Sequence, residues 1–101
     1  MSINIGNYHA EGPFGNENYL QARSGVYVIL GRKQTATNWS VVDIGESRDI
    51  RERVGNHDRA LCWRGQGHAE LAVAAIYADA QNRMVIERQL RTQFNPPCGL
   101  I

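Results

Sequence analysis

Two apolar runs decide the fold of this chain, GVYVIL at residues 25–30 and WSVVDI at residues 39–44. The first run is continuously apolar and rich in β-branched side chains, which is typical of a strand covered on both faces. Residues 31–38, between the two runs, are mostly polar. Two strands joined in this way are predicted to form an antiparallel hairpin with a long loop.

A helix is predicted directly after this hairpin. Ser47 is the expected N-cap, and Asp49 in the first turn suits the positive end of the helix dipole. Gly55 weakens the helix and is expected in its last turn. Residues 62–67, which include two glycines, are predicted to form a loop or a broken helix.

A third apolar run, residues 71–77, predicts a third strand. Asn82 is expected to cap a second helix that ends near Phe94, because Pro96 and Pro97 prevent its continuation. The element order ββαβα predicts an α/β (α+β) fold. In this fold, helices flank a small, mainly antiparallel, three-stranded sheet.

The composition indicates one domain with an arm. Residues 1–22 are polar and rich in Asn and Gly, and predict an irregular N-terminal arm on a domain at residues 23–101. A chain of 101 residues fits a single globular unit that buries about 65% of its extended-chain surface. No apolar run is long enough to span a bilayer, and the first residues lack a signal-peptide pattern. We therefore expect a cytoplasmic protein without membrane contact.

The two cysteines, Cys62 and Cys98, are too few for a disulfide framework or a zinc quartet. We expect both to be free thiols in a reducing cytoplasm, with pairing of the two as the alternative.

The net charge of +1 does not indicate a nucleic-acid binder, since such domains often carry a strongly basic face. The distribution of charge is more informative, because ten of the eleven basic residues are arginine, whose planar fork pairs with phosphate oxygens. One short segment holds five of them: Arg48, Arg51, Arg53, Arg59 and Arg64. The same segment contains three acidic residues, so a solvated helix face with internal ion pairs is the interpretation that charge alone favours.

Five polar side chains follow one another through the predicted elements: Tyr27, Asp43, Arg53, His57 and Glu87. Hydrolysis of a phosphodiester needs a deprotonated water, neutralisation of the extra charge on the phosphoryl oxygens and help for the leaving oxygen. Glu87 is a hard oxygen ligand suited to one Mg²⁺ or Mn²⁺ ion. Arg53 suits the non-bridging oxygens, and His57 can accept a proton at neutral pH. Taken singly, Tyr27 fits a core aromatic and Glu87 a helix ion pair, so only the joint order favours a site.

This ordered set resembles the GIY-YIG nuclease family. Gly25-Val26-Tyr27 is similar to the family's first triplet at the head of its first strand, and Asp43-Ile44-Gly45 occupies the place of its second triplet. Arg53 matches the family's helix arginine, His57 a histidine that many members carry one turn later, and Glu87 the metal-binding glutamate. The resemblance covers about residues 24–99.

The resemblance implies a metal-dependent endonuclease that hydrolyses phosphodiester bonds of DNA, with RNA as a further candidate substrate. It assigns Mg²⁺ or Mn²⁺ to Glu87, the role of general base to Tyr27 with His57 as its partner, and the phosphoryl oxygens to Arg53. Arg48, Arg51 and Arg59 are the expected nucleic-acid contacts. Members usually carry a separate targeting domain, so we expect a protein partner or an oligomer to serve targeting here.

Two positions depart from the family pattern. Asp43 stands where the second triplet opens with tyrosine, and Gly99 falls where a closing asparagine is usual. Asp43 has three interpretations: a second carboxylate near the metal, an ion-pair partner that orients Arg53, or the mark of a site that has lost its chemistry. The alternative function is therefore a catalytically impaired nucleic-acid-binding or protein-interaction module. Trp63 is expected in the core rather than stacked on a base.

Overall fold

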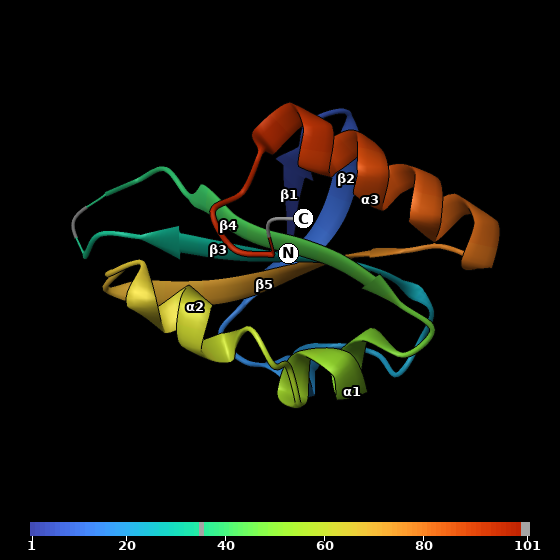
Figure 1. The fold of residues 1–101 in the computed structure, drawn as a ribbon, viewed down its shortest axis with the longest axis horizontal. Coiled ribbons are helices and arrows are strands. Elements are labelled where there is room, and N and C mark those ends of the chain that lie inside the picture. The colour runs from blue at the N-terminus through green and yellow to red at the C-terminus, as the bar shows by residue number, and fades with distance from the viewer. Residues whose placement is uncertain (35, 100–101) are drawn as a thin grey trace.

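The computed structural model describes residues 1–34 and 36–99, which form one five-stranded antiparallel sheet with helices on both faces (Figure 1). The strand order is β1-β2-β5-β3-β4, so β4 is an edge strand. The strands are β1 Ser2–Ile5, β2 Tyr8–Phe14, β3 Gly25–Arg32, β4 Ser40–Ser47 and β5 Glu70–Tyr77. The α+β class and the hairpin of β3 and β4 are confirmed, whereas the predicted number of three strands is wrong.

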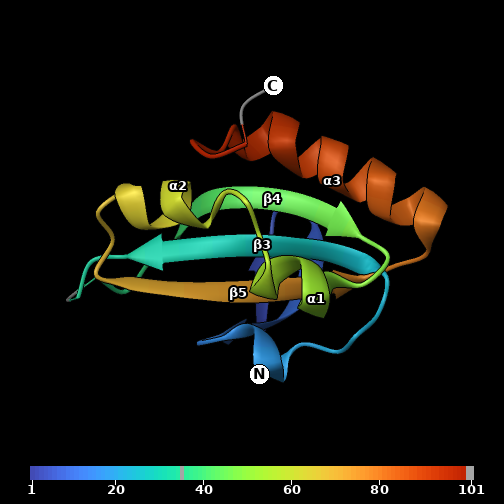
Figure 2. The same cartoon turned by 60° about the horizontal axis from the view of Figure 1, so that its bottom comes forward.

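The helices form two layers around this sheet. They are the 3-10 turn η1 Glu17–Tyr19 and the α-helices α1 Ile50–Gly55, α2 Ala60–Gly65 and α3 Ala80–Phe94. Figure 1 shows α3 on one face of the sheet and α1 and α2 on the other, and Figure 2 shows α1 over the central strands. Within the described residues, none of these helices is long and apolar enough to cross a membrane.

Two hydrophobic clusters, one on each face, hold the layers together. Val26 and Val28 of β3 pack in the cluster that contains Leu90 of α3. Tyr27 and Ile29 pack in the cluster that contains Ile50 and Trp63 from α1 and α2. Since successive strand residues point to opposite faces, this continuously apolar strand is covered on both sides, as its sequence predicts.

The N-terminal residues 1–22 are not an irregular arm, because they contain β1, β2 and η1. Ile5 and Ala10 are buried and belong to the core cluster beneath α3. The sequence feature that indicates β1 and β2 is a short alternation of polar and apolar residues around a turn at Gly6. The positive φ of Gly6, 58°, suits glycine. Gly12 and Pro13 obscured the second strand, and its register with β5 shifts between Glu11 and Phe14.

Both predicted helix caps are wrong, although the helix ends are confirmed at Gly55 and Phe94. Asp49 caps α1, because its side chain accepts the Glu52 N–H at 3.1 Å, while Ser47 is the last residue of β4. Asp79 caps α3 in the same way. A carboxylate just before the first turn also interacts favourably with the positive end of the helix dipole. Both observed caps are aspartates that directly precede their helices.

The prediction of two free thiols is wrong, because Cys62 and Cys98 form a disulfide across 36 residues of sequence. Residues 62–67, predicted as a loop or a broken helix, belong largely to α2. The segment after α3 runs along the edge of β4, where the Cys98 N–H donates to the Val42 carbonyl at 3.1 Å. The bond therefore ties α2 to the segment that follows α3.

Candidate active site at the edge of β4

A cleft of about 190 Å³ opens beside the edge strand β4. It brings together three of the four predicted catalytic residues from three elements: Tyr27 of β3, Arg53 of α1 and Glu87 of α3. The other residues that line it are Gly45, Glu46, Arg59, Arg91 and Gly99. Because α1 and α3 cover opposite faces of the sheet, side chains from both layers meet at this edge (Figure 1).

Tyr27 reaches the cleft by crossing the backbone of the edge strand. Its cross-strand partner is Gly45, and a Cβ atom added at Gly45 would lie only 2.0 Å from the Tyr27 hydroxyl oxygen. Any side chain larger than glycine would therefore displace the phenol. Gly45, the third residue of the second triplet, is therefore required by the close approach of Tyr27, the third residue of the first triplet.

His57 lies behind Tyr27 and does not line the cleft. Its side chain has no exposed surface, and its Nε2 atom forms a hydrogen bond with the Tyr27 hydroxyl. Its Nδ1 atom accepts the Arg59 backbone N–H at 3.0 Å. Because Nδ1 is the acceptor, a neutral imidazole carries its proton on Nε2 and donates it to the Tyr27 oxygen.

The pKa values of this pair favour that arrangement. Burial, followed by the charges of Arg53 and Arg59, lowers the pKa of His57 to about 4. Burial raises the pKa of Tyr27 to about 12, although Arg59, Arg53 and Arg91 act in the opposite direction. At neutral pH the protein alone therefore holds a neutral imidazole that donates to a neutral phenol.

Asp43 is completely buried and is paired with arginines other than the one expected. One carboxylate oxygen accepts the Arg59 Nε–H at 2.8 Å and the Trp63 indole N–H at 2.7 Å. The other accepts from Arg91 Nη2 and from the Ile44 backbone N–H, both at 2.8 Å. A carboxylate offers about four acceptor positions, and these contacts use all of them. The contacts favour the ion-pair role, with Arg59 and Arg91 in place of Arg53, and leave no position for a metal.

Glu87 and Glu46 supply the carboxylates that line the cleft. Glu87 Oε2 accepts from Arg91 Nε at 3.0 Å and its side chain is 24% exposed, while Glu46 Oε2 accepts from Arg83 Nε at 2.5 Å. No group of three or more metal-ligating side chains occurs among residues 1–34 and 36–99. Mg²⁺ commonly binds through one or two carboxylates and keeps its waters. Glu87 and Glu46 are oxygen ligands of the kind that such an ion uses, and one carboxylate oxygen of each is already engaged by an arginine.

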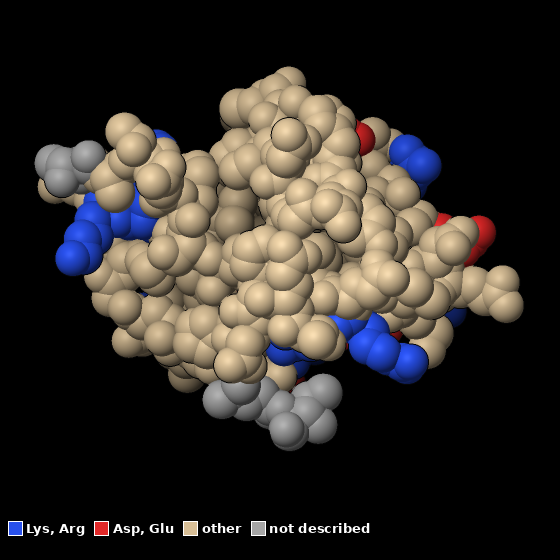
Figure 3. All heavy atoms as spheres, turned by 90° about the horizontal axis from the view of Figure 1, so that it is seen from above, with Lys and Arg blue, Asp and Glu red and all other residues tan. Residues whose placement is uncertain are grey.

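The remaining predicted residues differ in position. Arg53 donates from Nη2 to Asp58 Oδ1 at 3.1 Å, and this hydrogen bond lowers the pKa of Asp58. The Asp58 side chain is 78% exposed, so this pair lies in solvent. Arg59 lines the cleft, whereas Arg48 and Arg51 are exposed outside it. Lys and Arg side chains lie at the margins of the face seen in Figure 3 and not over its centre.

Sequence reasoning missed three parts of the cleft. Glu46 lines the cleft, and its place directly after the second triplet is the sequence feature that indicates this role. Arg91, considered only as a helix ion-pair partner of Glu87, also donates to Asp43 and from Nη1 to the Gly99 carbonyl at 3.0 Å. Gly99, the position of the missing asparagine, therefore contributes its backbone to the cleft. Trp63 is 8% exposed, which confirms its place in the core.

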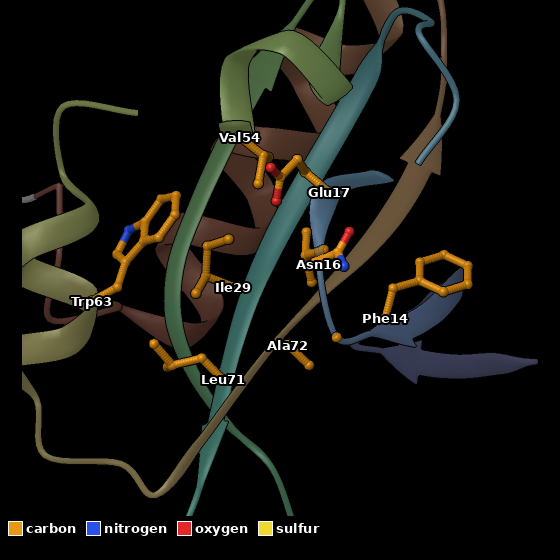
Figure 4. A pocket seen from close by; sticks show the side chains of 10 residues that line it. Phe14, Asn16, Glu17, Ile29, Val54, Trp63, Leu71 and Ala72 are labelled. Atoms are coloured by element: carbon orange, nitrogen blue, oxygen red, sulfur yellow. The ribbon is translucent and has the colours of Figure 1, made fainter. Parts of the chain in front are cut away.

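A second hollow, of about 110 Å³, lies on the face that carries α1 and α2 (Figure 4). Apolar side chains such as Ile29, Val54, Trp63 and Leu71 dominate its lining. Glu17 is the one ionisable side chain among its described lining residues. This hollow offers a single carboxylate and no basic side chain among its described lining residues, so the cleft at β4 is the candidate site.

No protein-family model matches this chain, and no curated protein or solved structure matches it.

Proposed function

We propose that the protein is a metal-dependent endonuclease that hydrolyses phosphodiester bonds of DNA. The observation that carries the proposal is the meeting of Tyr27, Arg53 and Glu87 in one cleft, although they come from three separate elements. These side chains supply the phenol, the guanidinium and the carboxylate that this hydrolysis needs together. The order of the same residues in the sequence, which resembles the GIY-YIG family, gives independent support.

In this proposal Tyr27 accepts the proton of the attacking water and His57 positions the Tyr27 oxygen. The hydrogen bond from His57 Nε2 to Tyr27 stabilises a phenolate more than a phenol. His57 cannot itself accept the proton of Tyr27 while its Nδ1 is held by the Arg59 N–H. Burial sets the high pKa of Tyr27, so Tyr27 acts as a base only after positive charge in the cleft has lowered this pKa and the phenol has released its proton to solvent.

Arg53 and the two glutamates complete the reaction site. Arg53 exchanges the exposed carboxylate of Asp58 for a non-bridging phosphoryl oxygen, a donor whose loss costs about 3 kcal/mol of transition-state stabilisation in comparable sites. Glu87, with Glu46 beside it in the lining, would hold Mg²⁺ or Mn²⁺. When bound, such an ion would supply positive charge for the phosphoryl oxygens and lower the pKa of water.

One observation favours a second candidate, a catalytically impaired nucleic-acid-binding module. Asp43 replaces the tyrosine of the second triplet, and it neutralises Arg59 and Arg91 at the cleft. Such a module would bind DNA through its remaining arginines, with an affinity that falls as salt rises, and would not cut it.

The two functions are separated by a cleavage assay on supercoiled, single-stranded and branched DNA in Mg²⁺ or Mn²⁺. The nuclease proposal predicts metal-dependent cutting by the wild type that is lost in Glu87→Gln. Glu11→Gln, on strand β2 and exposed, is the matched control and is expected to cut like the wild type. Absence of cutting by all three proteins, together with salt-sensitive DNA binding, would support the module instead.

A further inference from the structure

A third hollow, of about 350 Å³, lies near the start of β4 and is unused by the proposed reaction. Its lining contains two aromatic side chains, Trp39 and Phe94, together with the amides of Asn4 and Asn38 and the hydroxyl of Thr37. The other residues in the lining are aliphatic. A volume above about 300 Å³ is in the range of small-ligand pockets. We call this hollow the Trp39 pocket.

The chemistry of the Trp39 pocket suits a flat, neutral group with donors and acceptors at its edge. None of its described lining residues is charged. Aromatic side chains stack on the faces of unpaired bases, and asparagine amides can form paired hydrogen bonds with base edges. The β4 cleft, in contrast, has arginines and glutamates and suits phosphate and a cation. The two hollows therefore match the two chemical parts of a nucleotide strand.

Trp39 is held in place before any ligand binds. The Arg32 guanidinium lies 4.1 Å from the centroid of the Trp39 ring, and Arg32 Nε donates to Glu70 Oε1 at 2.8 Å. Trp39 also packs, partly buried, against the core cluster beneath α3. A ring fixed by a cation on a hydrophobic support loses little conformational freedom when a base stacks on it.

Two elements, β4 and α3, line both the Trp39 pocket and the β4 cleft, and the segment after α3 lies against β4 between them, at Val42. β4 runs from Val41 in the pocket to Gly45 in the cleft, which is about 13 Å at the usual rise of a strand. α3 runs from Phe94 in the pocket back to Glu87 in the cleft, about 10 Å along the helix. A stacked single strand, at about 3.4 Å per nucleotide, covers this separation in roughly three or four nucleotides.

We propose that the Trp39 pocket binds an unpaired base of the same DNA strand whose phosphate lies in the β4 cleft. This inference rests on the proposed function, because that function places a nucleotide strand at the cleft. It assigns to Trp39 and Phe94 the stacking contacts and to Asn4 and Asn38 the choice among bases. The protein would then select DNA that is single-stranded or opened near the bond to be cut.

The test is a binding measurement by fluorescence anisotropy, made in EDTA with the Glu87→Gln protein so that no DNA is cut. A short single-stranded DNA is compared with an abasic DNA of the same length, which has the same phosphates and no bases. If the Trp39 pocket holds a base, the normal strand is expected to bind about 10-fold more tightly than the abasic strand. Trp39→Ala is expected to remove this difference and to leave the binding of the abasic strand unchanged.

Two further variants control for folding and for position. Asn38→Ala changes an exposed residue of the pocket, so it is expected to leave the stability unchanged and to alter the preference between oligo-dA and oligo-dT. Phe14→Leu changes an aromatic residue that lines the hollow of about 110 Å³ (Figure 4). This variant, made in the Glu87→Gln protein, is expected to bind both strands as the Glu87→Gln protein does.

Equal binding of the normal and abasic strands would overturn the proposal, and so would an equal loss for both strands in Trp39→Ala. A free nucleoside monophosphate that binds as tightly as the strand would overturn the assignment to a strand-borne base. Cleavage plays no part in this measurement. A wild-type protein that fails to cut DNA but gives the predicted binding pattern would therefore retain the pocket and lose the nuclease assignment.

Discussion

Asp43 is the residue on which the geometry of the cleft depends most, because it joins two arginines from different elements. It has no exposed surface, and it accepts from Arg59 at the start of α2 and from Arg91 of α3. A residue that was considered as a metal ligand instead holds together the two helical layers at the sheet edge. In the proposed function, the carboxylates that remain to hold a metal ion are Glu87 and Glu46, which lie in the same cleft.

We predict that Asp43→Asn lowers the free energy of unfolding by about 3 kcal/mol, because it removes the counter-charge of Arg59 and leaves Arg91 paired with Glu87 alone. Urea denaturation at neutral pH measures this loss. Asp58→Asn is the control, since that carboxylate is 78% exposed and its ion pair lies in solvent. A loss in Asp43→Asn no larger than the loss in Asp58→Asn would contradict the ion-pair role.

His57 makes the stability of the protein depend on pH in a defined range. Its pKa in the folded protein is about 4, below the ordinary value of 6.5, so in this range the unfolded chain binds a proton that the folded protein does not. Stability is therefore present above about pH 6.5 and is lost as the pH falls toward 4. We predict a loss of about 2 kcal/mol between about pH 7.5 and pH 5.

The measurement is urea denaturation across that range in the wild type and in His57→Gln, which lacks the titrating group. The loss is expected to shrink to the carboxylate contribution alone in the variant. Identical slopes in the two proteins would show that His57 is not the neutral, buried donor described above.

At the scale of residues, the sequence allowed the main chemical groups to be predicted but not their partners. Tyr27, Arg53 and Glu87 were recognisable from order and spacing, and they line one cleft. The pairing of Asp43 with Arg59 and Arg91 was not predictable. This pairing depends on how α2 and α3 are placed at the sheet edge in the folded protein, and no local sequence pattern indicates that placement.

At the scale of elements, the edge of β4 is divided into a covered part and an open part. The segment after α3 covers the part near Val42, where Cys98 donates its backbone N–H, and the cleft opens at Gly45 and Glu46. The disulfide from Cys62 to Cys98 fixes the covering segment to α2. Gly99, which follows directly, is thereby held where its carbonyl meets Arg91.

We predict that reduction of this disulfide lowers the free energy of unfolding by about 4 kcal/mol, because the bond closes a loop of 36 residues in the unfolded chain. The measurement is urea denaturation with and without dithiothreitol. The double variant Cys62→Ser/Cys98→Ser is the control and is expected to be equally unstable in both conditions. A wild type that is indifferent to the reductant would contradict the structural role of the bond.

The elements themselves were predictable to different degrees. The strands β3, β4 and β5 and the helix α3 have long, clear patterns and were recognised from them. β1 is short and Gly12-Pro13 interrupts β2, so their weaker pattern resembles that of an irregular arm. The disulfide was missed for a different reason. Two cysteines far apart in sequence give no local signal, and the segment after α3 alone brings them together.

At the scale of the whole molecule, the sheet edge is the place where three layers contribute to one site. β3 provides Tyr27 from the sheet, α1 provides Arg53 from one face, and α3 provides Glu87 from the other. The Trp39 pocket lies along the same edge strand and the same helix. In the proposed function, a DNA strand that uses both hollows runs along β4 and α3 and passes the segment after α3, which lies against β4 at Val42.

The account depends most on Tyr27, whose phenol reaches the cleft only because residue 45 is glycine. The most direct test is the single-turnover rate of DNA cleavage by Tyr27→Phe, which keeps the packed ring and removes only the hydroxyl group. We predict a rate at least about 100-fold below that of the wild type, with DNA affinity nearly unchanged. The free energy of unfolding is expected to fall by about 1–3 kcal/mol, because the buried His57 Nε2–H loses its acceptor. A Tyr27→Phe protein that cuts DNA at the wild-type rate would contradict the central claim that this phenol is the catalytic base of the cleft.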